Sequence, residues 1–379
     1  MKNKKLLALL LFGGLTLTGC VNNDTEGNDA NNTTEQVEQT EENKEADTAT
    51  TETETAEETT RDSVVVEAAS LEEEPRYGTT IKIGFAADMC LSGQNLADLK
   101  GYYEEKGIDV EFVNTQNGKD ALSTGQIDIM TGEFGSLIVP ATKGLNYVFS
   151  TASHSGCKSL YVLDENSEYQ ETSDLIGKSI AVTNGIGNSG HNTLLRFLLH
   201  DDINPDDVSV KPVDKSAVIQ SLQGGEIGGA VLDDQFAKEF LDQGIIRPIR
   251  SLTTDEDFSK EVCCVSAFNR DFAEQNPMLA ELVGETIDMG NQYAADHPEE
   301  AVDLLQENNL AEGDNAVVKE LLTAYDYSLS NKDGEDTIIR YFDDYKELGL
   351  IDQSRSTDEL VKEYWMPFGN GEVEVIQNN

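Results

Sequence analysis

Three glycines in the middle of the chain could bind a negatively charged group. Gly185, Gly187 and Gly190 have the G-x-G-x-x-G spacing of dinucleotide-binding loops, after a β-branched apolar run and before a helical pattern. Asp206 lies about twenty residues further on, where such proteins place the acid that binds the ribose. Free N–H groups at the start of a helix equally suit a lone sulfonate, carboxylate or phosphate. The alternative is a capped turn in which glycine serves only the backbone geometry.

Polar loops at the carboxyl ends of the predicted strands are further candidates, because ligands bind there in open α/β sheets. His154 and Ser155 form a compact donor set, whereas Asp233 and Asp234 would repel a simple anion and favour an amine-bearing or cationic ligand. Each position fits turn or capping chemistry equally well. The candidate ligand-binding residues are Asp88, Met89, Cys90, Gly132, Glu133, Phe134, His154, Ser155, Gly187, Asn188, Ser189, Gly190, His191 and Asp233.

The cysteines fit three interpretations. Besides Cys20, the chain has Cys90 and Cys157 in the candidate loops and the adjacent pair Cys263 and Cys264. Buried thiols that pack as small apolar side chains are the most common use of free cysteine. Export would permit a disulfide between Cys90 and Cys157, and convergence of all four thiols with a histidine would make a metal site. Because adjacent cysteines lack the C-x₂-C spacing of structural zinc, we predict no metal and no cofactor.

The N-terminus predicts export and lipid attachment. Lys2, Lys4 and Lys5 precede an apolar run that is too short to span a bilayer comfortably, which is typical of a signal peptide. The ending Leu17–Cys20 resembles the lipobox of bacterial lipoproteins, in which the cysteine is acylated. We therefore expect a signal peptide over residues 1–19, a lipid anchor at Cys20 on the extracytoplasmic face of the membrane, and a disordered acidic tether over residues 20–77.

The charge of the chain restricts its partners. The 379 residues include 72 acidic and 27 basic side chains, which give a formal net charge of −45. A strong negative charge disfavours nucleic acid and electrostatic docking on anionic lipid. The remaining partners that we expect are a small-molecule ligand and membrane proteins, with the chain itself a monomer.

The elements that must position these residues alternate between strands and helices. Apolar runs at residues 81–87, 108–114, 127–133, 146–152 and 158–165 alternate with helical patterns in a first series, and a second series starts near residue 174. From residue 270 the pattern is almost wholly helical. We predict an α/β fold with lobe 1 at residues 78–170, lobe 2 at 171–262, and a hinge return with helical completion of lobe 1 at 263–379.

Several stretches together resemble the solute-binding proteins of ABC importers for nitrate, taurine and aliphatic sulfonates. They are residues 101–113, 174–199, 229–241 and 263–283, in the order that the family has. The resemblance implies a type II periplasmic-binding-protein fold, in which two α/β lobes joined by a two-strand hinge close on a small solute. It also implies that the closed receptor delivers the solute to an ABC permease with its ATPase.

This resemblance changes the interpretation of the glycine loop. An exported protein has no reliable supply of NAD, so we expect the loop to bind a small anionic group. None of the candidate loops contains an arginine, and Arg196, on the helix after the loop, is expected to be solvated. We rank sulfonates and taurine first, nitrogen heterocycles such as a thiamine-precursor pyrimidine second, and nitrate third. The alternatives are a related enzyme, a metal-binding protein that uses the cysteines and histidines, or a ligand sensor for a partner receptor.

Overall fold

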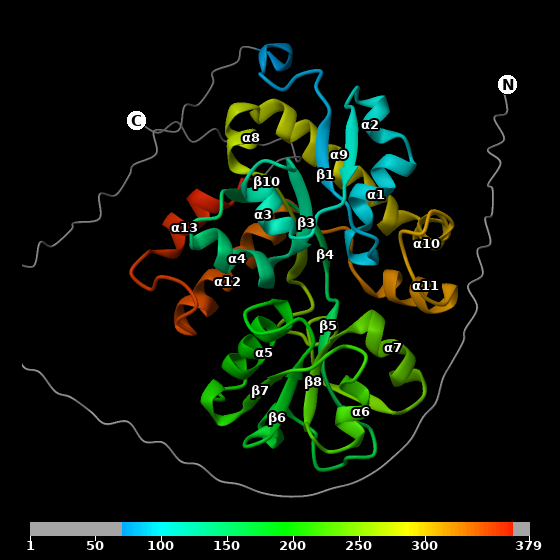
Figure 1. Cartoon of the computed structure of the whole chain (residues 1–379), viewed down its shortest axis with the longest axis vertical. Helices are drawn as coiled ribbons and strands as arrows, with labels where there is room; N and C mark the ends of the chain where they lie inside the picture. The colour runs from blue at the N-terminus through cyan, green and yellow to red at the C-terminus, as the bar shows by residue number, and fades with distance from the viewer. Residues whose placement is uncertain (1–69, 367–379) are drawn as a thin grey trace, which may run out of the picture. The chain divides into compact units, whose positions relative to one another are not determined.

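The computed structural model describes residues 70–366, so Cys20 and most of the expected tether lie outside the described residues. Two five-stranded sheets, each flanked by helices, lie one beyond the other along the long axis (Figure 1). Both have the same strand pattern, with three parallel strands followed by one long antiparallel strand and a fifth strand. This duplication forms the two lobes that the sequence predicts.

The first sheet has the order β2-β1-β3-β10-β4. Its strands are β1 (Ile81–Gly84), β2 (Val110–Val113), β3 (Ile129–Glu133), β4 (Tyr147–Ser155) and β10 (Val262–Asn269). Strands β4 and β10 are buried along their whole length, since helices cover both faces of this part of the sheet. The first-lobe helices are α1 (Ser92–Leu99), α2 (Tyr102–Glu105), α3 (Gly118–Ser123) and α4 (Phe134–Thr142), with the short turns η1 (Leu71–Glu73) and η2 (Met89–Leu91).

The second sheet has the order β7-β6-β8-β5-β9. Its strands are β5 (Lys158–Leu163), β6 (Ser179–Val182), β7 (Ser209–Pro212), β8 (Gly229–Asp233) and β9 (Ile246–Ser251). Pro248 is tolerated in β9 because an edge strand needs fewer backbone donors. The helices of this lobe are α5 (Ser189–His200), α6 (Val218–Gln223) and α7 (Asp234–Asp242), with the short turns η3 (Thr172–Leu175) and η4 (Pro205–Asp207).

The chain crosses between the sheets earlier than the sequence indicates. Residues 158–165 were expected to end the first lobe, with the boundary after residue 170, but β5 pairs with β8 and β9 in the second sheet. The first crossing is therefore the short link Gly156–Cys157 between β4 and β5. Local apolar patterning predicts that a strand exists, whereas its partner strands depend on pairings that are distant in sequence. The second crossing connects β9 to β10.

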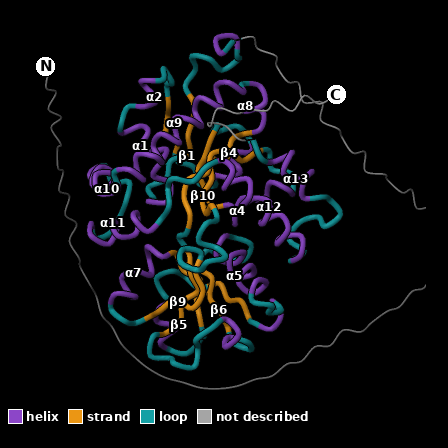
Figure 2. Tube along the Cα trace, turned by 180° about the vertical axis from the view of Figure 1, so that it is seen from behind, coloured by secondary structure: helices purple, strands orange, loops and turns teal. Residues whose placement is uncertain are grey.

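The helical C-terminal part packs mainly on the first lobe. Its helices are α8 (Arg270–Gln275), α9 (Pro277–Asp296), α10 (Pro298–Glu307), α11 (Asn315–Ala324), α12 (Asn331–Glu347) and α13 (Thr357–Tyr364). Helix α9 packs on α1 and β4, and α12 packs on β4 and α4. Viewed from behind, α12 and α5 lie on one flank of the molecule, and α11 and α7 lie on the other (Figure 2). Within residues 70–366, no helix is long and apolar enough to cross a membrane.

Candidate functional site

A cavity of about 930 Å³ lies between the two lobes. Its walls come from the carboxyl ends of β1, β3 and β8, the first crossing, the exposed face of α7, and the start of α11. This volume is within the range of small-molecule sites. Five of the predicted ligand-binding residues line it, namely Asp88, Cys90, Gly132, Glu133 and Asp233.

The cavity wall is strongly acidic. Only two cationic side chains are among the described residues that line it, Lys158 and Lys215. They face seven carboxylates, from Asp88, Glu133, Asp233, Glu239, Asp242, Glu312 and Asp314. Low-dielectric walls that carry one sign of charge attract ligands of the opposite sign.

Lys158 is already neutralised by two of these carboxylates. Its side chain is 4% exposed, and its Nζ forms ion pairs with Glu133 and Asp233. Burial works to lower the pKa of Lys158, but Glu133 and other negative neighbours raise it well above the usual value. Burial raises the pKa of Glu133, and Lys158 only partly offsets this effect. Lys158 therefore connects β3 to β8 across the lobes and offers little charge to an anionic ligand.

The candidates that the sequence offers do not include Lys158, the acidic face of α7, or residues 312–318. A lysine that opens the apolar run of residues 158–163 was a usable signal, since a buried strand seldom begins with an unpaired charge. Residues 312–318 belong to the helical part and approach the cavity only through tertiary packing. No local pattern indicates that approach.

Four thiols meet at the inner end of the cavity. The Sγ atoms of Cys157 and Cys263 are 2.7 Å apart, and those of Cys90, Cys157 and Cys264 lie within 4.8 Å of one another. All four cysteines are free. Hydrogen bonds from Cys263, Cys264 and Cys90 hold the pKa of Cys157 well below its usual range, against the effect of burial. The thiols also lie near Glu133, whose carboxylate accepts from the Cys157 thiol at 3.8 Å.

Four predicted residues are buried away from the cavity wall. Met89 and Phe134 are fully buried in the core, where Phe134 packs against Phe149. His154 is also fully buried; its Nδ1 lies 2.8 Å from the Ser155 carbonyl and its ring stacks on Tyr325. The side chain of Ser155 accepts a hydrogen bond from the backbone N–H of Asp326. None of these four residues lines the cavity. Their role as ligand contacts therefore remains a prediction.

The glycine loop lies outside the cavity lining. Gly185 and Gly187 adopt φ angles of +82° and +81°, which glycine reaches without a steric penalty, so both serve the backbone turn. The Gly187 N–H donates to Nδ1 of His191 at 3.2 Å. The start of α5 instead faces the first lobe, where Ser189 packs near Gly135 and Asn192 donates to the Gly135 carbonyl at 2.6 Å. Ser189 and Asn188, which accepts a hydrogen bond from Lys119, thus contribute to the contact between lobes, and Gly187, Gly190 and His191 do not line the cavity.

The two adjacent aspartates at the end of β8 have different environments. Asp233 lines the cavity, whereas Asp234 is 8% exposed and accepts hydrogen bonds from Tyr161 at 2.8 Å and Thr253 at 2.5 Å. Burial raises the pKa of Asp234 to about 6, although both hydrogen bonds act in the opposite direction. Asp234 therefore supports the crossing region and does not face a ligand.

We expect Asp234→Asn to raise the free energy of unfolding at neutral pH by about 2–3 kcal/mol, since two pKa units correspond to roughly this energy. The folded-state pKa is raised, so the native state binds the proton more tightly and stability is lost as the pH rises toward and past about 6. The extra stability of Asp234→Asn over wild type should disappear in acid, where wild-type Asp234 is protonated. Urea denaturation across this pH range measures the effect, with Asp206→Asn at an exposed position as the control; an equal difference at every pH would contradict it.

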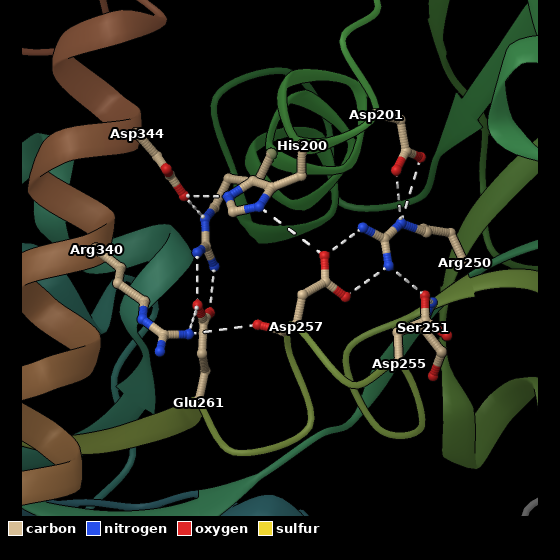
Figure 3. Close-up of polar contacts among 10 residues, drawn as sticks. His200, Asp201, Arg250, Ser251, Asp255, Asp257, Glu261, Arg340 and Asp344 are labelled. Carbon is tan, nitrogen blue, oxygen red and sulfur yellow. Dashed lines mark hydrogen bonds and ion pairs between the residues drawn. The ribbon is translucent and has the colours of Figure 1, made fainter.

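A buried ion-pair network joins the lobes on the side away from the cavity. Arg196 is fully buried and not solvated as expected; its guanidinium donates to Glu261 at 2.7 and 3.0 Å and to Asp344 at 2.6 Å. Figure 3 shows Asp344 and Arg340 on one helix, with Glu261 and His200 beside them. The arginine was misjudged because its acceptors lie 65 and 148 residues away along the chain.

The second crossing is held by a neighbouring arginine. Arg250, on β9, forms ion pairs with Asp255 and Asp257 at 2.5 Å each and with Asp201 at 3.2 Å (Figure 3). The hydrogen bond from Arg250 is the main reason why the pKa of Asp257 lies below its usual value. These contacts fix the segment that leads into Glu261 and β10.

The chain matches known proteins in sequence and in fold. The family model described as "NMT1/THI5 like" matches residues 92–301. The taurine-binding periplasmic protein of Escherichia coli (strain K12) is 28% identical over 229 residues, which are 56% of this chain and 68% of the relative. The aliphatic sulphonate binding protein SsuA from Escherichia coli superposes with a TM-score of 0.61 at 19% identity, covering 74% of this chain and 96% of that one.

The fold is shared with an enzyme as well. The desulfurization enzyme DSZB superposes with a TM-score of 0.54 at 16% identity, over 74% of this chain and 95% of that one. The similarity to SsuA confirms the predicted two-lobe periplasmic-binding-protein fold, while the fold alone does not separate receptors from enzymes. The family model spans more than half of the sequence, and the chain belongs to the NMT1/THI5-like family, the solute-binding family of nitrate, taurine and aliphatic sulfonates.

Proposed function

We propose that this protein is the extracytoplasmic receptor of an ABC importer, and that it captures a small solute in the cavity between its lobes. The cavity carries the proposal, because walls from both lobes can enclose a ligand when the lobes close. The relative matched in sequence is itself a binding protein, which supports capture and release without chemistry. A membrane permease and its ATPase would be the partners.

The same proposal includes attachment to the membrane. Cys20 would carry the lipid, and the acidic segment that follows would tether the receptor above the extracytoplasmic surface. The basis for this part is the sequence of the first twenty residues, which lie outside the described structure.

We infer that the solute carries an amine or another cationic group, as taurine does. The seven carboxylates of the wall outnumber two lysines, and Lys158 is already paired with Glu133 and Asp233. A simple anion such as nitrate would meet net repulsion there, whereas the amine of a zwitterion would be attracted. The sulfonate end of such a ligand would contact Lys215, whose side chain is 53% exposed and lies 3.9 Å from Asp233.

Taurine is expected to bind the purified protein at least tenfold more tightly than ethanesulfonate, which has the same sulfonate but no amine. Asp233→Asn should weaken taurine binding about tenfold, which corresponds to about 1.4 kcal/mol, because it removes a carboxylate from the wall. Isothermal titration calorimetry measures both effects. The matched control is Asp206→Asn, which makes the same charge change at an exposed site outside the cavity lining.

Two results would contradict this ligand class. Equal affinity for taurine and ethanesulfonate would show that the amine is not recognised. Tighter binding of nitrate than of taurine would show that the acidic wall does not set the selectivity.

A further inference from the structure

We propose that Cys90, Cys157, Cys263 and Cys264 bind one thiophilic metal ion at the inner end of the cavity. The Sγ atoms of Cys157 and Cys263 are 2.7 Å apart, closer than the roughly 3.8 Å between two sulfurs on one tetrahedral ion, so these two thiols would separate slightly when an ion binds. The ligand atoms of Cys90, Cys157 and Cys264 lie within 4.8 Å of one another, as do those of Cys157, Cys263 and Glu133. Cys157 belongs to both groups, so the other three thiols and the Glu133 carboxylate surround it. Cysteine sulfurs are the ligands that proteins use for zinc and other thiophilic ions.

Three separate parts of the fold supply these ligands. Cys90 lies in η2 after the first strand, and Cys157 lies in the first crossing, where it has a φ angle of +90°. Cys263 and Cys264 are adjacent in β10. In a regular strand two adjacent side chains point to opposite faces and could not share an ion.

An irregular region in β10 removes this obstacle. The pairing of β10 with β4 shifts register between Val262 and Cys264 and again between Cys264 and Val265. At such an irregularity the direction of a strand's side chains changes. The sulfurs of both Cys263 and Cys264 therefore lie beside the sulfur of Cys157. The spacing rule that argued against metal in the sequence therefore does not apply to this strand.

The surroundings of the thiols favour a ligand over simple core packing. Cys90, Cys157 and Cys264 line the cavity, so an ion has a path of entry and one open side. Two buried polar atoms beside them, Nε2 of His154 and the hydroxyl of Tyr325, have no hydrogen-bond partner among the described residues. His154 lies opposite Cys264 across the β4–β10 pair, and its ring stacks on Tyr325.

The charges nearby fit a bound cation. A divalent ion with four thiolates carries an excess of negative charge, and Lys158, next to Cys157 in the chain, lies beside it with its ammonium shared between Glu133 and Asp233. The carboxylate of Glu133 adds an oxygen ligand beside Cys157 and Cys263. The acidic wall also concentrates cations at the entrance. This site does not depend on the solute proposed above.

The test uses the purified, reduced and chelator-treated protein, with Cd²⁺ and Zn²⁺ as probes. We expect one equivalent of Cd²⁺ to bind with the ultraviolet charge-transfer absorption of cadmium thiolates, and Zn²⁺ to compete for the same site. Cys90→Ser and Cys264→Ser should each lower the affinity for Zn²⁺ at least tenfold. Cys20→Ser makes the same substitution at the remaining cysteine and should change nothing.

Circular dichroism of each variant confirms that it is folded, so that a loss of binding reports on the ligand and not on the fold. Absence of thiolate absorption in the folded wild type would overturn the proposal. So would unchanged affinity in both Cys90→Ser and Cys264→Ser, or a Cys157–Cys263 disulfide whose reduction yields no metal uptake. Taurine titration of the same samples keeps this result separate from the solute proposal, because either can fail alone.

Discussion

Arg196→Met is expected to lower the free energy of unfolding by about 3–5 kcal/mol, which is the usual cost of removing one partner from a buried ion pair. The side chains of Arg196 and Glu261 are 1% and 6% exposed, so Glu261 cannot regain full hydration when the arginine is lost. Arg340 still pairs with Glu261 at 3.3 Å after the substitution, so we expect the loss of unfolding free energy to lie near the lower end of this range. A loss of this size is a large part of the stability of an ordinary domain.

Urea denaturation at neutral pH measures this effect, and Arg340→Met is the matched control. Arg340 contacts the same carboxylate but is 54% exposed, so its removal should cost less than about 1 kcal/mol. Burial would raise the pKa of Asp344, but the contacts with His200 and Arg196 hold it below the usual value. A depressed carboxylate pKa gives stability that is lost as the pH falls through it, so the difference between Arg196→Met and wild type should shrink in acid. Equal costs for the two arginines would contradict the network.

Lys158→Met is the second substitution for which we expect a large effect, again about 3–5 kcal/mol at neutral pH. The change leaves Glu133 and Asp233 facing each other across the lobes without the ammonium that separates them. The raised pKa of Lys158 means that its contribution is complete below the ordinary lysine pKa and is lost only as the pH rises through the folded value. The destabilisation should therefore be constant from neutral to mildly alkaline pH.

Lys215→Met is the control for this experiment. Lys215 approaches the same Asp233, at 3.9 Å, with a side chain that is 53% exposed, so its removal should cost less than about 1 kcal/mol. Denaturation curves for the two lysine variants at the same ionic strength give the comparison. If Lys158→Met were as stable as wild type, Lys158 would not act as a structural connection between the lobes.

The sequence predicts the repeated strand–helix order well, because period and turn residues are local properties. It does not predict which sheet a strand joins, and β5 was assigned to the wrong lobe for this reason. The expectation that ligands bind at the carboxyl ends of the strands correctly identified Asp88, Glu133 and Asp233 in the cavity wall. It also selected the glycine loop, whose helix start packs against the other lobe.

Long-range partners account for the remaining differences. Burial of Arg196 depends on acidic residues from the second crossing and from α12, which no window of sequence contains. The adjacency of Cys263 and Cys264 argues against a shared ion until the irregular register of β10 is known. Irregular pairing of this kind follows from the packing of the whole sheet and has no signature in local composition.

The unequal contacts on the two flanks determine how the molecule can open. On the α5–α12 flank the lobes share the buried Arg196 network and the hydrogen bond from Asn192 to Gly135. On the α7–α11 flank Gln235 donates to the Glu312 carbonyl in an exposed contact, and the buried Lys238 pairs with Glu320, whose side chain is 65% exposed, each at 3.0 Å. Pairs with an exposed partner separate at less cost than pairs that are buried on both sides. The α5–α12 flank should therefore stay closed and act as the hinge side. The lobes should separate at the α7–α11 flank, where the solute enters and leaves.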